Sequence, residues 1–195
     1  MGRRIEQKRK ENKNSSRFGK NQKETFANKH REMQKAIQKT KTTPLNTLDL
    51  LKLLRNQPQF LGVFASDELK YLKIVDYPVY FIANLDSSQY NGSHWIAFRI
   101  TRFKIELFDS LGLNPSTWNQ YPTFIINFLK SQILTKSLVI SPAIQTPNSH
   151  ICGLYCIFFI QYRRLESFKS CCRRFSKLSL EQNSVILKQL LLNLD

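Results

Sequence analysis

The fold of this chain depends on one stretch, Pro147-Asn148-Ser149-His150-Ile151-Cys152-Gly153-Leu154-Tyr155-Cys156-Ile157-Phe158-Phe159-Ile160. From Ile151 to Ile160, every residue except Gly153 is apolar, aromatic or cysteine. A helix with this pattern is hydrophobic on all sides and has to be buried. The sequence therefore predicts a central core helix that begins after Pro147 and continues to about Phe168.

Cys152 falls in the first turn of this predicted helix, where Asn148 or Ser149 is placed to cap the first free N–H groups. The positive end of the helix dipole favours thiolate over thiol, which makes the sulfur a better nucleophile. Taken alone, the position favours a small core residue, because free cysteine is among the most buried residue types. Other residues have to decide between these two interpretations.

The chain is strongly basic, with 30 Lys and Arg against 14 Asp and Glu and a net charge of +16. Up to Thr43 there are 14 basic and 4 acidic residues, a net charge of +10. This segment has too few apolar residues to repay the entropy of ordering. We therefore expect a basic tail over residues 1–43, disordered or at most transiently helical, and one folded domain over residues 44–195. The charge favours an anionic partner, nucleic acid first and a membrane surface second.

Other features exclude several classes of protein. No apolar run reaches the roughly 18 residues of a membrane span, and no signal-peptide core is present, so no membrane partner is expected. Four cysteines without a secretion signal predict free thiols in a reducing compartment. His150, Cys152 and Cys156 lack the spacing of a zinc site, so no metal is expected. We also expect a monomer and no cofactor that the chemistry requires.

The remaining elements follow from local patterns. Strands are predicted at residues 78–84, 94–100, 104–109 and 138–140, the second and third as antiparallel neighbours. Helices are predicted at 46–54, 66–69, 121–133 and 180–194, and 60–64 as an apolar turn. The last helix is expected to place Leu180, Val185, Ile186, Leu190 and Leu194 on or near one face. Helices, then a small sheet, then helices are typical of the α+β class.

Three polar residues lie where this chain would expose functional groups. His94 opens a predicted strand, Asp109 closes the neighbouring strand, and Gln145 lies seven residues before Cys152. Each of them alone has an ordinary structural explanation. Together with Cys152 they supply what thiol acyl transfer needs: a nucleophile, an imidazole base, a carboxylate that orients the imidazole, and an amide for the oxyanion.

The same residues resemble the adenovirus-type cysteine proteases (adenain), and most of all the versions encoded by self-synthesising DNA transposons (Maverick/Polinton) and related viruses. The similarity covers roughly residues 45–164. Its motifs are Phe60-Leu61-Gly62, His94-Trp95, Leu107-Phe108-Asp109-Ser110-x-Gly112 and Gln145-x-Pro147-Asn148-Ser149-x-x-Cys152-Gly153-Leu154-Tyr155-Cys156. The resemblance implies a papain-like, adenain-type fold, in which a small mixed sheet packs on a buried helix that carries the nucleophile, with flanking helices.

The resemblance also implies a role for each site residue: Cys152 as nucleophile, His94 as base, Asp109 as the third member and Gln145 in the oxyanion hole. Trp95 would pack beside them. Adenovirus enzymes carry Glu where this chain has Asp109, whereas proteases of ubiquitin-like proteins carry Asp.

The implied function is cleavage of viral or transposon-encoded capsid and precursor proteins, in association with DNA, in the host nucleus or in the virion. The basic tail would contact the DNA, and DNA is a candidate activator. Viral members also use a peptide cofactor tethered by a disulfide. The tethering cysteine would fall near Leu134, so a covalent peptide cofactor is not expected here. Two alternatives stay open: a protease of ubiquitin-like modifiers, and an inert nucleic-acid-binding module on the same fold.

Overall fold

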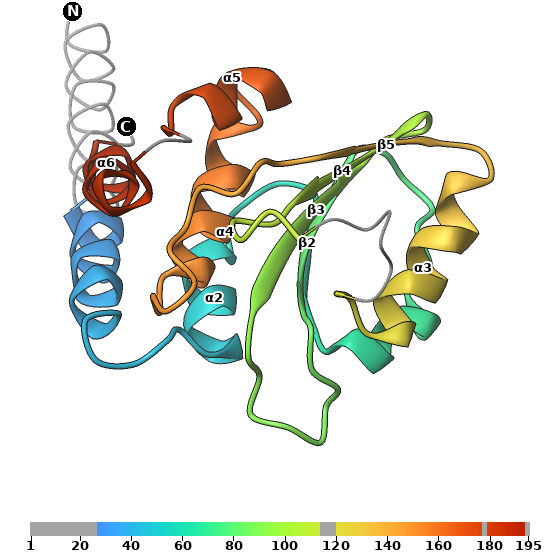
Figure 1. Cartoon of the computed structure of the whole chain (residues 1–195), viewed down its shortest axis with the longest axis horizontal. Coiled ribbons are helices and arrows are strands. Elements are labelled where there is room, and N and C mark those ends of the chain that lie inside the picture. The colour runs from blue at the N-terminus through green and yellow to red at the C-terminus, as the bar shows by residue number, and fades with distance from the viewer. Residues whose placement is uncertain (1–26, 114–119, 177–178, 194–195) are drawn as a thin grey trace, which may run out of the picture.

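Five strands form one mixed sheet with helices on both of its faces (Figure 1). The structure is a computed structural model and describes residues 27–113, 120–176 and 179–193. The strands are β1 (Phe60–Phe64), β2 (Val79–Asn84), β3 (Trp95–Ile100), β4 (Lys104–Phe108) and β5 (Ser137–Ile140). The helices are α2 (Thr47–Leu54), the short 3-10 helix η1 (Ser66–Tyr71), α3 (Thr123–Ile133), α4 (Cys152–Tyr162), α5 (Phe168–Arg173) and α6 (Leu180–Leu192).

The strands lie in the order β1-β2-β3-β4-β5. The β2–β3 and β3–β4 pairs are antiparallel and the two outer pairs are parallel, so the predicted antiparallel neighbours and the α+β class are confirmed. The prediction of a turn over residues 60–64 is wrong, because these residues pair with β2 as an edge strand. An irregularity between Phe60 and Gly62, where Gly62 has a φ of 141°, interrupts the period of two by which a strand is recognised.

The central helix α4 is buried along its whole length, as predicted. It lies with α2 on one face of the sheet, and the Phe159 ring stacks on Phe108 of β4 at a centroid distance of 4.7 Å. Its predicted end near Phe168 is wrong. The helix ends at Tyr162, and after a polar linker Ser167 caps α5 by accepting a hydrogen bond from the Ser170 N–H.

The predicted cap at the start of α4 is also wrong. Ile151 occupies the N-cap position and no side chain caps the helix. Cys152 is therefore the first residue of α4, and its side chain is only 4% exposed.

Helices α3 and η1 cover the opposite face of the sheet. There the rings of Phe81 and Phe98 stack at 4.7 Å, and Phe128 of α3 meets both edge-on. The sheet thus separates two apolar clusters.

Residues 27–39 form a helix that packs on the domain, which corrects the expectation of disorder for this part of the tail. Met33 and Ala36 are buried in the same cluster as α4, and Ile37 packs against it. These three residues, at helical spacing, form one apolar stripe on the helix. The low apolar content of the whole segment made this stripe hard to recognise in the sequence. Residues 1–26 lie outside the described residues.

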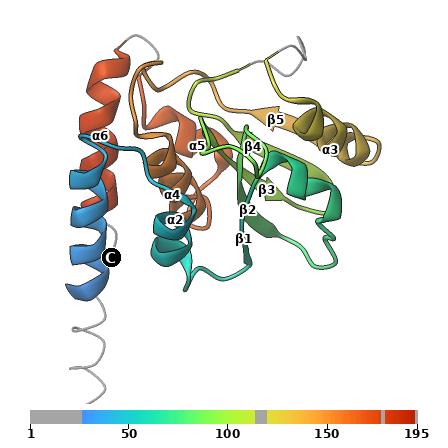
Figure 2. The ribbon, with the colours of Figure 1, turned by 90° about the horizontal axis from the view of Figure 1, so that it is seen from below.

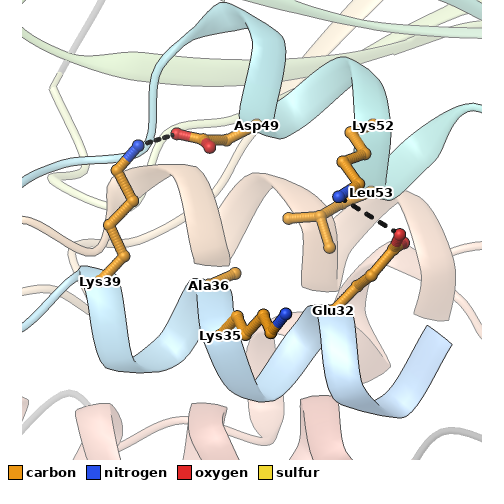
Figure 3. Close-up of a pocket in the computed structure, with 7 residues that line it drawn as sticks. All are labelled: Glu32, Lys35, Ala36, Lys39, Asp49, Lys52 and Leu53. Atoms are coloured by element: carbon orange, nitrogen blue, oxygen red, sulfur yellow. Dashed lines mark hydrogen bonds and ion pairs between the residues drawn. The ribbon is translucent and has the colours of Figure 1, made fainter. Parts of the chain in front are cut away.

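The helix of residues 27–39 lies next to α6 in both overall views (Figures 1 and 2). It is also joined to α2 by ion pairs between Lys39 and Asp49 (2.5 Å) and between Glu32 and Lys52 (3.4 Å). Figure 3 shows these pairs at the two ends of a cleft of about 220 Å³ between the helices. The folded domain therefore extends N-terminal to Pro44.

The buried face of α6 matches the predicted one only in part, since Ile186 and Leu190 pack against the core as predicted. Asn183, Leu187 and Leu191 are buried, whereas Val185 is 56% exposed. Asn183 belongs to the buried stripe because its amide donates hydrogen bonds to the carbonyl oxygens of Ile144 and Ser176, which a pattern of apolar residues does not reveal. Leu194 lies outside the described residues. Over the part of the chain that the structure covers, no helix has the length and apolar content to cross a membrane.

Candidate active site

The sheet and α4 bring three of the four predicted site residues to one place. His94 immediately precedes β3 and Asp109 immediately follows β4, and these strands are antiparallel neighbours with Ala97 opposite Phe108. Both residues therefore lie at the same end of the sheet. His94, Asp109 and Cys152 are 6%, 0% and 4% exposed, so the cluster is nearly free of bulk solvent.

His94 contacts both of the other residues. Its Nε2 lies 2.8 Å from Oδ1 of Asp109, and its side chain lies close enough to that of Cys152 for the two to interact. Burial acts to lower the pKa of His94, but the interactions with the Asp109 carboxylate and with Cys152 raise it to about 9. His94 is then an imidazolium at neutral pH, and an imidazolium beside a cysteine favours the thiolate form of the sulfur.

Other groups besides His94 bind the carboxylate of Asp109. Oδ1 also accepts a hydrogen bond from the Leu111 N–H (2.9 Å), and Oδ2 accepts one from the Tyr121 hydroxyl (2.7 Å). The backbone of Asp109 is fixed as well, because its N–H donates to Oγ of Ser141 and its carbonyl accepts from the same hydroxyl. Tyr121 and Ser141 could not be predicted from the sequence, since a hydroxyl in a loop has no periodic signal.

Gln145 is oriented by two hydrogen bonds and is 3% exposed. The Ser110 hydroxyl donates to Oε1 (2.7 Å), and Nε2 donates to the carbonyl oxygen of Ser149, three residues before Cys152 (3.0 Å). An amide nitrogen has two N–H groups, so one remains for another acceptor. Ser110 was also missed, although it belongs to the quoted motif Asp109-Ser110-x-Gly112.

The turn after β4 lies directly against the loop before α4. The carbonyl oxygen of Ser110 accepts hydrogen bonds from the N–H groups of Ile144 and Gln145, each at 2.9 Å. Gly112 has a φ of +64°, and a Cβ there would lie 2.2 Å from the backbone nitrogen of Ala143. Glycine at position 112 thus allows the contact that places Gln145 beside the Asp109 turn.

Trp95 is buried beside His94, as expected, and its indole N–H donates to the carbonyl oxygen of Leu45 (2.8 Å). This bond ties the start of β3 to the segment that leads into α2. It fixes the backbone immediately after His94.

None of the four cysteines forms a disulfide within the described residues. Burial raises the pKa of Cys156, and burial and the nearby Glu166 raise that of Cys171 to about 12, so both thiols stay neutral. Cys172 is half-buried on α5. Within the described residues, no group of three or more His, Cys, Asp or Glu side chains is arranged to hold a metal ion.

The fold and this arrangement of cysteine, imidazolium and carboxylate define a cysteine peptidase. The family model of the adenovirus endoprotease matches residues 60–187, and the chain belongs to this family. The resemblance found in the sequence motifs is thereby confirmed at the level of the family. No curated protein matches the chain.

The chain is similar to two solved structures. The ASFV protease is 18% identical over 78% of this chain and 68% of its own, with a TM-score of 0.50. The SUMO protease Ulp1 is 18% identical over 76% of this chain and 79% of its own, with a TM-score of 0.40. At 18% identity, the likeness to the ASFV protease concerns the fold alone.

Proposed function

We propose that this protein is an endopeptidase that cleaves capsid or other precursor proteins of a virus or a transposon-like element. The family supports a viral or virus-like setting. The observation that carries the proposal is the contact of His94 with both Asp109 and Cys152 in a buried cluster.

In the proposed reaction, the Cys152 thiolate attacks the carbonyl carbon of the scissile peptide bond and forms a tetrahedral oxyanion. His94 then gives its proton to the leaving amine, the C–N bond breaks, and an acyl-enzyme thioester remains. Next, neutral His94 takes a proton from a water molecule, which attacks the thioester and releases the acid product and the thiolate. Asp109 orients the imidazole and stabilises its charged form throughout.

The oxyanion has two candidate donors. Cys152 is the first residue of α4, so its backbone N–H has no partner within the helix. The second donor is the remaining N–H of Gln145, whose amide Ser110 holds in one orientation. Donors that are fixed before the reaction stabilise the charge that develops in the transition state.

We further propose that DNA is a partner and a candidate activator. Residues 1–26 carry 9 Lys and Arg against 3 Asp and Glu, a net charge of +6. Lys and Arg of this number bind the phosphate backbone without reading the base sequence. The same residues would suit action in a host nucleus or inside a particle that contains DNA. A disulfide-tethered peptide is not part of this proposal, because position 134 is Leu.

Two classes of substrate can be compared directly. The protein is incubated with capsid precursors of the virus or element that encodes it, and with a precursor of a ubiquitin-like modifier, and products are mapped by mass spectrometry. Cleavage of the capsid precursor by the native protein and by Cys172→Ala, but not by Cys152→Ala, is expected. Cleavage of the modifier precursor alone would contradict the proposed substrate class and favour the alternative protease function.

A further inference from the structure

Tyr121 is a buried tyrosine whose hydroxyl lies against the carboxylate of Asp109. The hydroxyl donates to Oδ2 at 2.7 Å and also lies 3.3 Å from the carbonyl oxygen of Leu113. Tyr121 is 4% exposed and Asp109 is fully buried. Burial and the charge of Asp109 raise the pKa of Tyr121, so the hydroxyl keeps its proton and is a permanent donor.

We propose that Tyr121 is a positioning residue that fixes the Asp109 carboxylate in the orientation required by His94. This inference rests on the proposed peptidase mechanism and adds to it a residue that does not touch the substrate. Tyr121 acts through Asp109, and Asp109 acts on His94.

The second oxygen of the Asp109 carboxylate, Oδ2, needs a donor of its own. A carboxylate can rotate about its Cβ–Cγ bond, and His94 and the Leu111 N–H both bind the same oxygen, Oδ1. These two bonds leave Oδ2 without a partner in a site from which water is excluded. The Tyr121 hydroxyl supplies that partner, and with both oxygens bound the carboxylate plane is fixed.

The position of Tyr121 in the fold supports its role as a positioning residue. It lies two residues before α3, and its side chain belongs to the apolar cluster between α3 and the sheet. The active-site cysteine lies on the opposite face, in the cluster around α4. Tyr121 therefore connects the α3 layer to a site that is built mainly from the α4 side.

The test is Tyr121→Phe, which removes the hydroxyl and keeps the ring in the core. Hydrolysis of a peptide substrate is expected to show kcat lower by about 10-fold, with KM within about twofold, because the lost bond orients a catalytic group and binds no substrate. In an Asp109→Asn background the same change should cost nothing further, since both changes disable one step.

Tyr162→Phe is the matched control. Tyr162 is also buried, and its hydroxyl donates to the carbonyl oxygen of Leu190 at 3.0 Å, within the α4–α6 contact. This variant should lose a similar amount of thermal stability and keep its kcat.

A native kcat in folded Tyr121→Phe, or a full additional loss in the Asp109→Asn background, would overturn the inference. If Tyr121→Phe does not fold, site-specific 3-fluorotyrosine at position 121 keeps the shape and changes only the strength of the donor. A changed kcat at unchanged Tm then supports the positioning role, and an unchanged kcat overturns it. A native protein that cleaves no peptide would instead refute the proposed function, on which the inference depends.

Discussion

His94 is the residue whose charge decides the pH range of activity. Its pKa of about 9 means that the imidazolium is present at neutral pH and is lost as the pH rises through 9. Since the imidazolium protonates the leaving amine, kcat/KM should fall on the basic side with a midpoint near pH 9. Asp109→Asn removes a hydrogen bond and a charge that raise this pKa, so the midpoint should move down by at least about one pH unit.

The measurement is the pH profile of kcat/KM for the native protein and for Asp109→Asn. Asp49→Asn, which loses a carboxylate that pairs with Lys39 and not with His94, is the control and should keep the native profile. A midpoint near pH 6.5 in the native protein would show that His94 does not have the environment described above.

Gln145 and Ser110 are expected to act as a pair. Gln145→Ala should lower kcat by about 10²-fold with little change in KM, as for the loss of one oxyanion donor. Ser110→Ala leaves Oε1 without its donor and lets the amide turn, so a smaller loss of about 10-fold is expected. Single-turnover kinetics on both variants would check this.

Ser170→Ala is the control for Ser110→Ala. The Ser170 hydroxyl donates to Glu166 and not to Gln145, so this variant should keep the native kcat. An increase of KM alone in Gln145→Ala would assign Gln145 to substrate binding.

The chemistry of single residues shows why part of the site was predictable. Cys152, His94, Asp109 and Gln145 were found because their residue types, in this order, match the parts of one reaction, and the spacing follows a family pattern. Tyr121, Ser110 and Ser141 were not found. Their hydroxyls act through contacts across 12 to 35 residues of sequence, which only the folded chain reveals.

Helix α4 is fixed at its C-terminal end by a buried ion pair. Arg163 donates from Nε and Nη2 to the carboxylate of Glu106 on β4, at 2.7 and 2.9 Å, and Glu106 is 2% exposed. Glu106→Gln leaves Arg163 without its counter-charge, so the free energy of unfolding should fall by about 3 kcal/mol.

Denaturant unfolding of Glu106→Gln checks this expectation. Glu32→Gln is the matched variant, because Glu32 pairs with Lys52 and Arg55, whose side chains are more than half exposed. It should cost less than about 1 kcal/mol. Equal losses in the two variants would mean that the Glu106 pair does not hold α4 to the sheet.

Among the elements, types were easier to predict than boundaries. The uninterrupted apolar run identified α4, and runs of strand length separated by turn residues identified the strands next to His94 and Asp109. The end of α4 was missed because Phe168 continues the apolar pattern beyond a polar linker. Strand β1 was missed because its pairing is irregular at Gly62. The centre of the buried face of α6 was missed because a buried Asn183 replaces an apolar residue there.

At the scale of the whole molecule, the charge at the N-terminus should be separable from catalysis. If residues 1–26 neutralise about six phosphates, the logarithm of the binding constant for duplex DNA should fall with the logarithm of the salt concentration at a slope of about −5. Removing residues 1–26 should flatten this slope and leave hydrolysis of a short peptide without DNA nearly unchanged. Salt-titrated DNA binding and peptide hydrolysis by both proteins provide the comparison.

The cut has to fall before the helix of residues 27–39. A protein that begins at Pro44 would also lose Met33 and Ala36 from the core, and should be less stable and less active for that reason. Equal salt slopes for the native protein and the protein without residues 1–26 would place the DNA contact on the folded domain.

The most direct test of the central claim is the rate at which an electrophilic thiol probe modifies each cysteine in the folded protein. Exposure alone favours Cys172, since Cys152, Cys156 and Cys171 are 4%, 1% and 0% exposed. If His94 holds Cys152 as a thiolate, Cys152 is modified first, peptidase activity is lost in step with its modification, and His94→Ala slows it by at least about 10²-fold. Faster modification of Cys172, with Cys152 unmodified and activity retained, would contradict the assignment of Cys152 as the nucleophile.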